Sequence, residues 1–100
     1  MGNIKKLKIT ILGYTNDSYP GWVKCCFDDI HGETHYFEEK VPVITKIELN
    51  QNSTFPKEET ILCQVINLNN NMITVDISNP WGIEDENGES IFVVNSDNIE

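Results

Sequence analysis

The apolar residues of this chain recur at every second position, which is the spacing of a β-strand that buries one face. The clearest case is the stretch KLKITI at residues 6–11, in which lysine or threonine alternates with leucine or isoleucine. The sequence contains no alanine, and Val, Ile, Thr, Phe and Tyr dominate its apolar runs. Because these residue types favour strands over helices, the pattern predicts an all-β protein with little helix.

Six such runs are separated by turn residues, and we expect strands at 4–14, 22–28, 34–43, 61–66, 72–77 and 90–95. In the region 45–60, the segment Ile47-Glu48-Leu49 fits either a short strand or one helical turn, and the tail 96–100 is expected to be loose. One hundred residues form one domain, 1–100. About six short strands predict a small antiparallel barrel or sandwich, and the barrel is favoured because closure removes exposed strand edges.

The segment DIHGE at residues 29–33 is typical of a hairpin with three loop residues and a left-handed glycine. Counting back from this turn places Cys25 opposite Phe37 and Cys26 opposite Tyr36. Because neighbouring side chains of a strand point to opposite faces, we expect Cys25 in the core and Cys26 outside. The adjacent thiols are therefore predicted to form neither a disulfide nor a shared metal site.

The sequence predicts no metal centre and no cofactor. The potential zinc ligands are Cys25, Cys26, His31, His35 and Cys63, but no Cys-x-x-Cys pair occurs among them. The dipeptide Asn87-Gly88 predicts a tight turn, and together with Asp85 it resembles half of a calcium loop. Ile83 and Val94 occupy positions where that loop needs oxygen ligands, which leaves weak calcium binding as an alternative. Phosphate loops, nucleophile elbows and dinucleotide fingerprints do not occur.

A small-molecule-binding or enzymatic barrel is a rival hypothesis, in which Cys26, His35 and nearby carboxylates line a pocket. A thiol nucleophile needs a base within reach and a lowered pKa. In the expected register His35 shares a face with Cys25, and the carboxylates of Asp28 and Glu38 would raise the pKa of the Cys26 thiol. The sequence therefore favours a protein that is not an enzyme.

The negative charge is concentrated in the second half of the chain. Seven lysines and seven acids balance over residues 1–57, whereas residues 58–100 carry nine acids and no base, so the net charge of −9 lies there. The sequence contains no arginine. Because nucleic acids and anionic lipids are bound through Lys and Arg, both are disfavoured, and a basic protein is the expected partner. The alternative is that the acidity serves only solubility.

The predicted partner-binding surface is the loop that begins at Trp81 and continues through Glu84, Asp85, Glu86 and Glu89. An aromatic anchor beside charged residues is typical of a protein interface. The alternative is that Trp22 and Trp81 each plug one end of the barrel, an explanation that suits Trp22 better. We therefore expect a small acidic protein-binding domain, for example an immunity-type inhibitor of a basic toxin. A structural or regulatory module is a third hypothesis.

Four segments together resemble an uncharacterised family of bacterial proteins of about this length: ILGY at 11–14, YPGWV at 19–23, EKVPV at 39–43 and NPWGIE at 79–84. The resemblance implies an all-β barrel and a bacterial cytosolic setting, and it supplies no catalytic residues. No apolar run reaches the roughly 18 residues of a membrane helix. The start of the chain does not read as a secretion signal either, so a cytoplasmic protein is expected.

Overall fold

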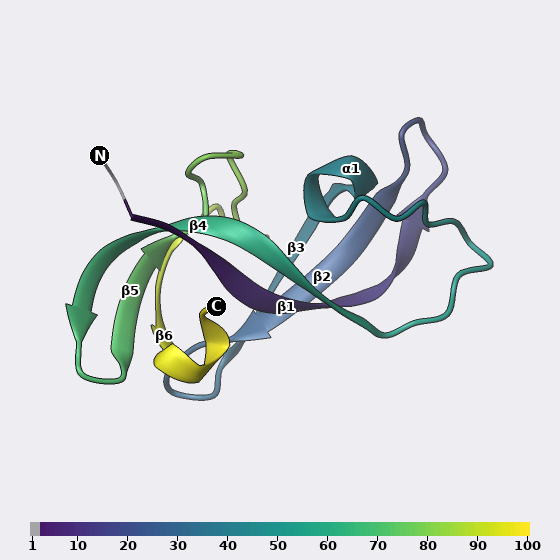
Figure 1. The fold of residues 1–100 in the computed structure, drawn as a ribbon. Helices are drawn as coiled ribbons and strands as arrows, with labels where there is room; N and C mark the ends of the chain where they lie inside the picture. The colour runs from purple at the N-terminus through teal and green to yellow at the C-terminus, as the bar shows by residue number, and fades with distance from the viewer. Residues whose placement is uncertain (1–2) are drawn as a thin grey trace.

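The computed structural model describes residues 3–100 and contains one six-stranded antiparallel sheet. Its strands are β1 (Asn3–Asn16), β2 (Trp22–Asp28), β3 (Thr34–Lys40), β4 (Lys57–Asn69), β5 (Met72–Asp76) and β6 (Ile91–Asn95). A single helical turn, α1 (Val41–Ile44), follows β3, and a 3-10 turn, η1 (Ser96–Asn98), follows β6. The order β3-β2-β1-β4-β5-β6 curls into a half-barrel (Figure 1), which confirms the predicted fold class.

Strand β1 joins the two halves of the sheet. Its residues Asn3–Ile11 pair with β4, and its residues Thr10–Asn16 pair with β2. The ladder with β2 shifts register after Ile11 and again after Tyr14. Because such bulges bend a strand and increase its twist, β1 can pass from one half of the curled sheet to the other (Figure 1).

The buried faces of the strands meet inside the curl, and the predicted alternation decides which residues lie there. In β1 the buried residues are Leu7, Ile9 and Ile11, as the period of two predicts. The remaining strands contribute Val23, Cys25, Phe27, Phe37, Ile61, Cys63, Ile73, Val75, Phe92 and Val94. Side chains from outside the strands, including Ile44, Leu49, Ile77 and Ile83, complete this core.

The β2–β3 hairpin has the register that the sequence predicted. Cys25 lies opposite Phe37, and Cys26 lies opposite Tyr36. Gly32 has a φ of 80°, the left-handed conformation expected for a turn with three loop residues. Cys25 is fully buried and Cys26 is half-buried, and the three cysteines Cys25, Cys26 and Cys63 are free thiols.

The expected strand 34–43 ends earlier, because α1 begins at Val41. Pro42 lies in the first turn of α1, where its fixed φ suits a helix and its missing N–H is not needed. Strand β4 begins at Lys57 and ends at Asn69, so it is longer than the predicted run. The segment Ile47-Glu48-Leu49 is neither strand nor helix; Leu49 is buried and Ile47 is exposed.

The tail is not loose, contrary to the sequence-based expectation. Ile99 forms a β-bridge with Leu7, and the backbone N–H of Glu100 donates to the carbonyl of Lys6 at 2.9 Å. The ladder between β1 and β2 extends no further toward the start of β1 than Thr10, so the backbone of Lys6 and Leu7 has a free edge on that side. The tail occupies this edge, which satisfies backbone groups that strand β2 leaves unpaired.

The two outer strands, β3 and β6, are linked across the open side of the half-barrel without forming a ladder. The N–H of Ile30, in the β2–β3 turn, donates to Val93 of β6 at 2.8 Å. The N–H of Glu86, in the β5–β6 loop, donates to Tyr36 of β3 at 2.9 Å. Each bond occupies one backbone carbonyl of an outer strand, whose edge could otherwise pair with another chain. Within residues 3–100, no helix is long and apolar enough to cross a membrane.

Replacement of Gly32 by alanine isolates the cost of its backbone conformation. A Cβ at Gly32 would meet no atom within 4 Å, so the expected loss of about 1 kcal/mol in the free energy of unfolding comes from left-handed strain alone. Gly13 is the matched control, because a Cβ there also meets nothing within 4 Å and its φ is not left-handed. Urea unfolding of Gly32→Ala and Gly13→Ala measures both; equal losses would contradict this explanation.

Candidate functional site

The β5–β6 loop is held against the barrel by a few buried residues. Ile77 and Ile83 are 0% and 1% exposed, and the side chain of Asn79 donates to Gln64 of β4 at 2.8 Å. The hydrogen bond from Glu86 to Tyr36 attaches the same loop to β3. The loop therefore has a fixed position although it contains no helix or strand, and Trp81 and Glu84, which lie between its anchors, face solvent.

The structure separates the predicted partner-binding residues into two groups. Trp81 is 57% exposed, and Glu84, Glu86 and Glu89 are also exposed. Asp85 is only 6% exposed, so its side chain lies inside and is not available to a partner. Because Trp81 is exposed, it does not plug an end of the barrel, which was the alternative role that the sequence suggested for it.

Trp22, which the sequence suggested as a plug for one end of the barrel, is only partly covered. Its side chain is half-buried at the start of β2, and the ammonium group of Lys40 lies 5.2 Å from the centre of its ring. A lysine at this distance from an aromatic face makes a favourable cation–π contact.

Asp85 organises its own turn. Its Oδ1 accepts hydrogen bonds from the N–H groups of Asn87 at 2.9 Å and Glu89 at 2.8 Å. Its N–H donates to the carbonyl of Glu89, and its carbonyl accepts from Gly88, whose φ is 80°. The side chain thus fixes the chain direction into β6, which is the ordinary role of an aspartate at the first position of a turn.

Replacement of Asp85 by alanine tests this role. It leaves two N–H groups without their acceptor, and we expect a loss of about 1–2 kcal/mol in the free energy of unfolding. Asp85→Asn keeps an oxygen acceptor and should lose less. Glu84→Ala, at an exposed neighbouring position, should change the stability by less than about 0.5 kcal/mol. Urea unfolding compares the three variants; an Asp85→Ala protein as stable as Glu84→Ala would contradict the role.

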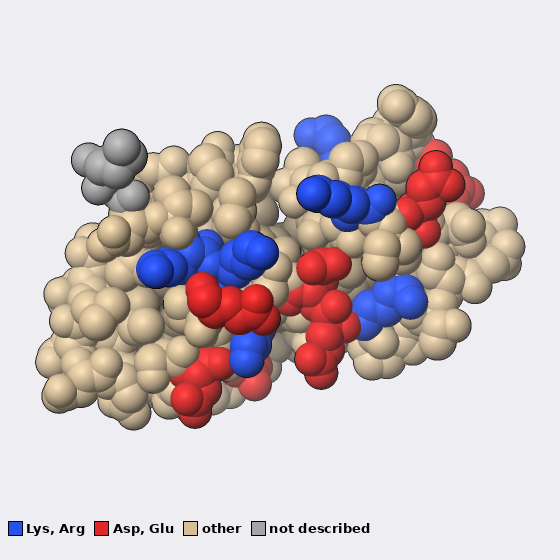
Figure 2. Space-filling view, viewed as in Figure 1, with Lys and Arg blue, Asp and Glu red and all other residues tan. Residues whose placement is uncertain are grey.

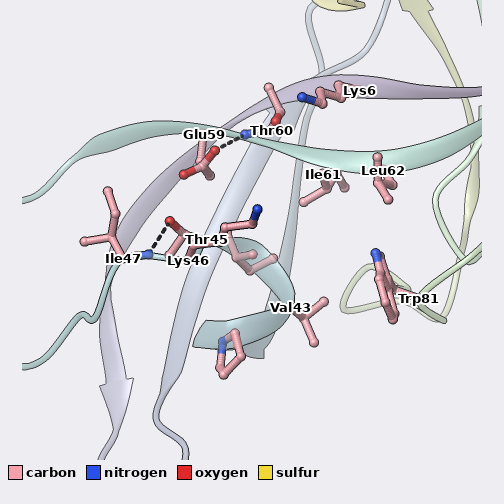
Figure 3. A pocket seen from close by; sticks show the side chains of 12 residues that line it. Lys6, Val43, Thr45, Lys46, Ile47, Glu59, Thr60, Ile61, Leu62 and Trp81 are labelled. Carbon is pink, nitrogen blue, oxygen red and sulfur yellow. Dashed lines mark hydrogen bonds between the residues drawn. The ribbon is translucent and has the colours of Figure 1, made fainter.

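Beside Trp81 lies a groove of about 430 Å³ between α1, the segment after it and β4. Its apolar wall includes Val43, Ile47, Leu62 and Trp81, of which Ile47 is 63% exposed (Figure 3). Lys6, Lys46 and Glu59 line its rim. The groove can hold one or two apolar side chains, with Trp81 as a rigid wall.

A second hollow, of about 330 Å³, lies beside the loop's acidic segment. Glu38 of β3 lines it together with Glu84, Asp85 and Glu86, and Lys24 is its one basic lining residue. The ammonium of Lys24 lies 4.9 Å from the centre of the Tyr36 ring. This part of the surface is strongly negative, and a cationic side chain is the group that it would attract.

Elsewhere on the surface, the fold places lysines from the first half of the chain next to acidic residues from the second half. The β1–β4 ladder places Lys8 opposite Thr60 and Thr10 opposite Glu58, and one hollow is lined by Lys6, Lys8, Glu58, Glu59 and Glu100. Figure 2 shows lysines and acids interspersed on one face. Part of the negative charge of residues 58–100 is therefore balanced by lysines of β1, and the exposed glutamates of the β5–β6 loop are not part of that mixture.

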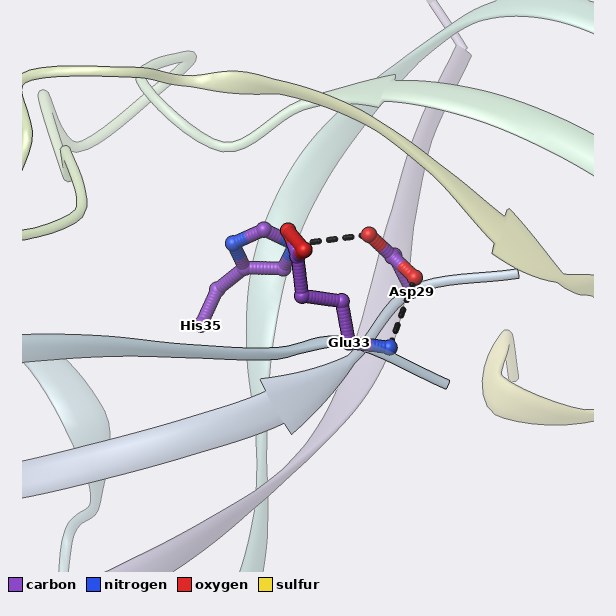
Figure 4. Close-up of side chains that lie close together, drawn as sticks. All are labelled: Asp29, Glu33 and His35. Carbon is purple, nitrogen blue, oxygen red and sulfur yellow. Dashed lines mark hydrogen bonds and ion pairs between the residues drawn. The ribbon is translucent and has the colours of Figure 1, made fainter. Parts of the chain in front are cut away.

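A second cluster surrounds His35, whose side chain is 14% exposed. Its Nε2 lies 2.8 Å from Asp29 Oδ2 and 3.9 Å from Glu33 Oε1 (Figure 4). Its Nδ1 lies 3.7 Å from Asp85 Oδ2. The ring packs between Phe27 and Phe92, with centroid separations of 5.5 Å and 4.6 Å. The imidazole of His35 is therefore held by two phenylalanine rings, and its nitrogens face three carboxylates.

Asp29 repeats the geometry of Asp85. Its Oδ1 accepts hydrogen bonds from the N–H groups of His31 and Glu33, and its N–H donates to the carbonyl of Glu33 at 2.9 Å. The hydrogen bond with His35, supported by the two backbone bonds, holds the pKa of the Asp29 carboxyl below its usual value, although burial opposes the shift. Asp29 is thus an ionised group.

The Cys26 thiol does not face the carboxylates around His35. Cys26 lies on the opposite face of β2 from Phe27, the cross-strand partner of His35, and lines a shallow hollow with Lys8, Asp28 and Glu58. Burial raises the pKa of Cys25 to about 12 and that of Cys63 to about 11. Burial and the nearby Asp28 carboxylate also raise the pKa of Cys26. A raised pKa lowers the thiolate fraction at neutral pH, which is the reverse of what a nucleophile needs.

Alkylation of the native protein tests this assignment. We expect iodoacetamide to label Cys26 alone, more slowly than a free cysteine at pH 8, with a rate that still rises with pH where that of a free cysteine levels off, because burial and the Asp28 carboxylate raise the pKa of Cys26. Cys26→Ser should abolish labelling of the native protein, and His35→Gln should leave the rate unchanged. Mass spectrometry locates the label; a fast reaction that requires His35 would support the thiol-enzyme hypothesis instead.

Sequence reasoning considered His35 but missed the carboxylates that the fold brings to it. A signal was present: the pattern Asp-x-x-Gly-Glu occurs at 29–33 and again at 85–89. Both segments form the same turn, with the aspartate Oδ1 bound to the backbone and Oδ2 toward His35. The pattern predicts each turn; the meeting of the two turns depends on the fold.

Comparison of the chain with protein-family models, with curated proteins and with solved structures found no match. The functional assignment therefore depends on the geometry described above.

Proposed function

We propose that this protein is a non-enzymatic binding domain whose β5–β6 loop and adjoining groove recognise a basic protein. The observation that carries the proposal is Trp81, a large aromatic side chain that is 57% exposed on a loop fixed by buried anchors. A fixed, exposed tryptophan loses little conformational freedom when it is covered, so it is suited to anchor a partner.

The surroundings of Trp81 support a partner with both apolar and cationic groups. The groove beside it accepts apolar side chains, with Leu62 and Val43 on its walls. Glu84, Glu86 and Glu38 line a separate, negative hollow beside the same loop. A basic segment that inserts an apolar residue beside Trp81 would place lysine or arginine near these glutamates, where long-range attraction accelerates association.

An immunity-type inhibitor that caps a basic toxin is the concrete form of this proposal, in the bacterial cytoplasmic setting that the sequence resemblance implies. The acidic loop would give fast capture, and the tryptophan groove would slow release. The rival thiol site is less well supported, because Cys26 and His35 lie on opposite faces and the pKa of Cys26 is raised.

Charge reversal at the loop tests the proposal. The wild-type chain is immobilised and offered a bacterial lysate, and the association rate of each retained protein is then measured at low and physiological salt. We expect basic proteins to be retained, with association at least about tenfold slower at the higher salt. Trp81→Ala should accelerate dissociation by about thirtyfold, the effect of losing roughly 2 kcal/mol at a hot spot.

The matched control separates a local effect from net charge. Lysine at Glu84, Glu86 and Glu89 changes the net charge from −9 to −3, and so does lysine at the exposed Asp17, Glu48 and Asp97. The first variant should lose the partner and the second should keep it. Equal binding by both variants, or retention that is insensitive to salt and to Trp81→Ala, would overturn the proposal.

A further inference from the structure

We infer that His35, Asp29 and Glu33 form a binding site for a divalent first-row transition-metal ion such as Zn²⁺. One ligand atom from each of the three residues lies within 4.8 Å of the others. Imidazole nitrogen and carboxylate oxygen are both zinc ligands, and three protein ligands leave a fourth position for water. This site lies apart from the Trp81 groove, and the inference does not depend on the proposed partner.

The strand geometry explains why the three ligands converge. Glu33 directly precedes β3 and His35 is the second residue of that strand, so the two side chains are two positions apart on extended backbone and point to the same face. Asp29 lies across the turn from Glu33, to which its N–H donates at 2.9 Å. Figure 4 shows the three side chains gathered at the mouth of the hairpin. The site is therefore built into one tight turn and needs no movement of the backbone.

The distances suit a small tetrahedral ion. A zinc ion with ligands at 2.0–2.1 Å has ligand atoms about 3.3 Å from one another. Here Nε2 lies 2.8 Å from Asp29 Oδ2 and 3.9 Å from Glu33 Oε1, which bracket that value. Asp29 Oδ1 is occupied by two backbone N–H groups, so Oδ2 is the atom left for a metal. The Glu33 side chain is 74% exposed and can adjust its position.

A buried carboxylate on the far side of the imidazole is a second observation that supports a metal site. Asp85 has a side chain only 2% exposed, and its Oδ2 lies 3.7 Å from His35 Nδ1. Metal-ligating histidines characteristically donate their other ring N–H to a carboxylate, which fixes the tautomer and strengthens the ligand. When a metal ion replaces the Nε2 proton that hydrogen-bonds Asp29 Oδ2, the remaining ring proton lies on Nδ1, toward Asp85, and the Nε2 lone pair is directed to the site between Asp29 and Glu33. Asp85 is thus a positioning residue for the metal ligand.

Imidazole selects among metals. Ca²⁺ and Mg²⁺ prefer oxygen ligands, and Ca²⁺ needs six or more of them, whereas this site offers one nitrogen and two carboxylates. Phe27 and Phe92 pack on the ring and hold it in place. The site should therefore bind Zn²⁺ in preference to Ca²⁺.

Calorimetric titration of the full chain with Zn²⁺, in a Cys26→Ser background that removes the accessible thiol, tests the inference. We expect one ion per chain in the micromolar range. Glu33→Gln, at an exposed position, should weaken Zn²⁺ binding at least about tenfold. His35→Gln removes a direct ligand, so it should weaken binding by more than the roughly 10–100-fold that is typical when a residue that only hydrogen-bonds a metal ligand is changed. Asp85→Asn, which keeps an acceptor for its turn, should weaken it by about tenfold.

The control is His31→Ala, an exposed histidine in the same turn that is not one of the three ligands. Its Zn²⁺ affinity should match that of the parent. Nitrogen-detected NMR of the histidine rings should show that Zn²⁺ changes the chemical shift of His35 Nε2 and leaves the ring signals of His31 unchanged. This measurement uses the wild-type side chains and does not depend on any variant folding. No shift of His35 at excess Zn²⁺, equal losses for His31→Ala and Glu33→Gln, or equal affinity for Ca²⁺ would overturn the inference.

Discussion

The arrangement of this molecule depends on the double pairing of strand β1. One end of β1 is bound to β4 and the other to β2, with bulges after Ile11 and Tyr14 that let the strand bend between them. This single element places the β2–β3 hairpin on one side of the half-barrel and the β4–β6 strands on the other. The β5–β6 loop can then reach from β5 across to Tyr36 of β3.

The position of the β5–β6 loop surface and the contact of Asp85 with His35 both depend on that crossing, and Asp85 connects the two candidate sites. Its backbone and Oδ1 shape the turn that carries the exposed glutamates, and its Oδ2 faces the imidazole of His35. A metal ion bound to His35 would therefore act on the same aspartate that fixes the acidic loop. The two sites differ in chemistry, because one offers an aromatic and anionic surface and the other a nitrogen with two carboxylates.

Local patterns predicted local structure well. The apolar alternation and the DIHGE turn were enough to place Cys25 opposite Phe37, since a hairpin register is set by its turn and by which face is buried. They failed where distant segments decide the outcome. The tail 96–100 is ordered because β2 leaves the edge of Lys6 and Leu7 free, and no feature of the tail's own residues shows this.

The sequence alone determined the strand content, the inward and outward faces of the strands and both Asp-x-x-Gly-Glu turns, because each follows from backbone preferences over a few residues. The tertiary structure decided which charges and ligands meet. It set lysines of β1 beside Glu58 and Glu59, buried Asp85 while leaving Trp81 exposed, and brought Asp85 to His35. Such meetings depend on the pairing of strands that are far apart in the chain, and residue spacing carries no information about them.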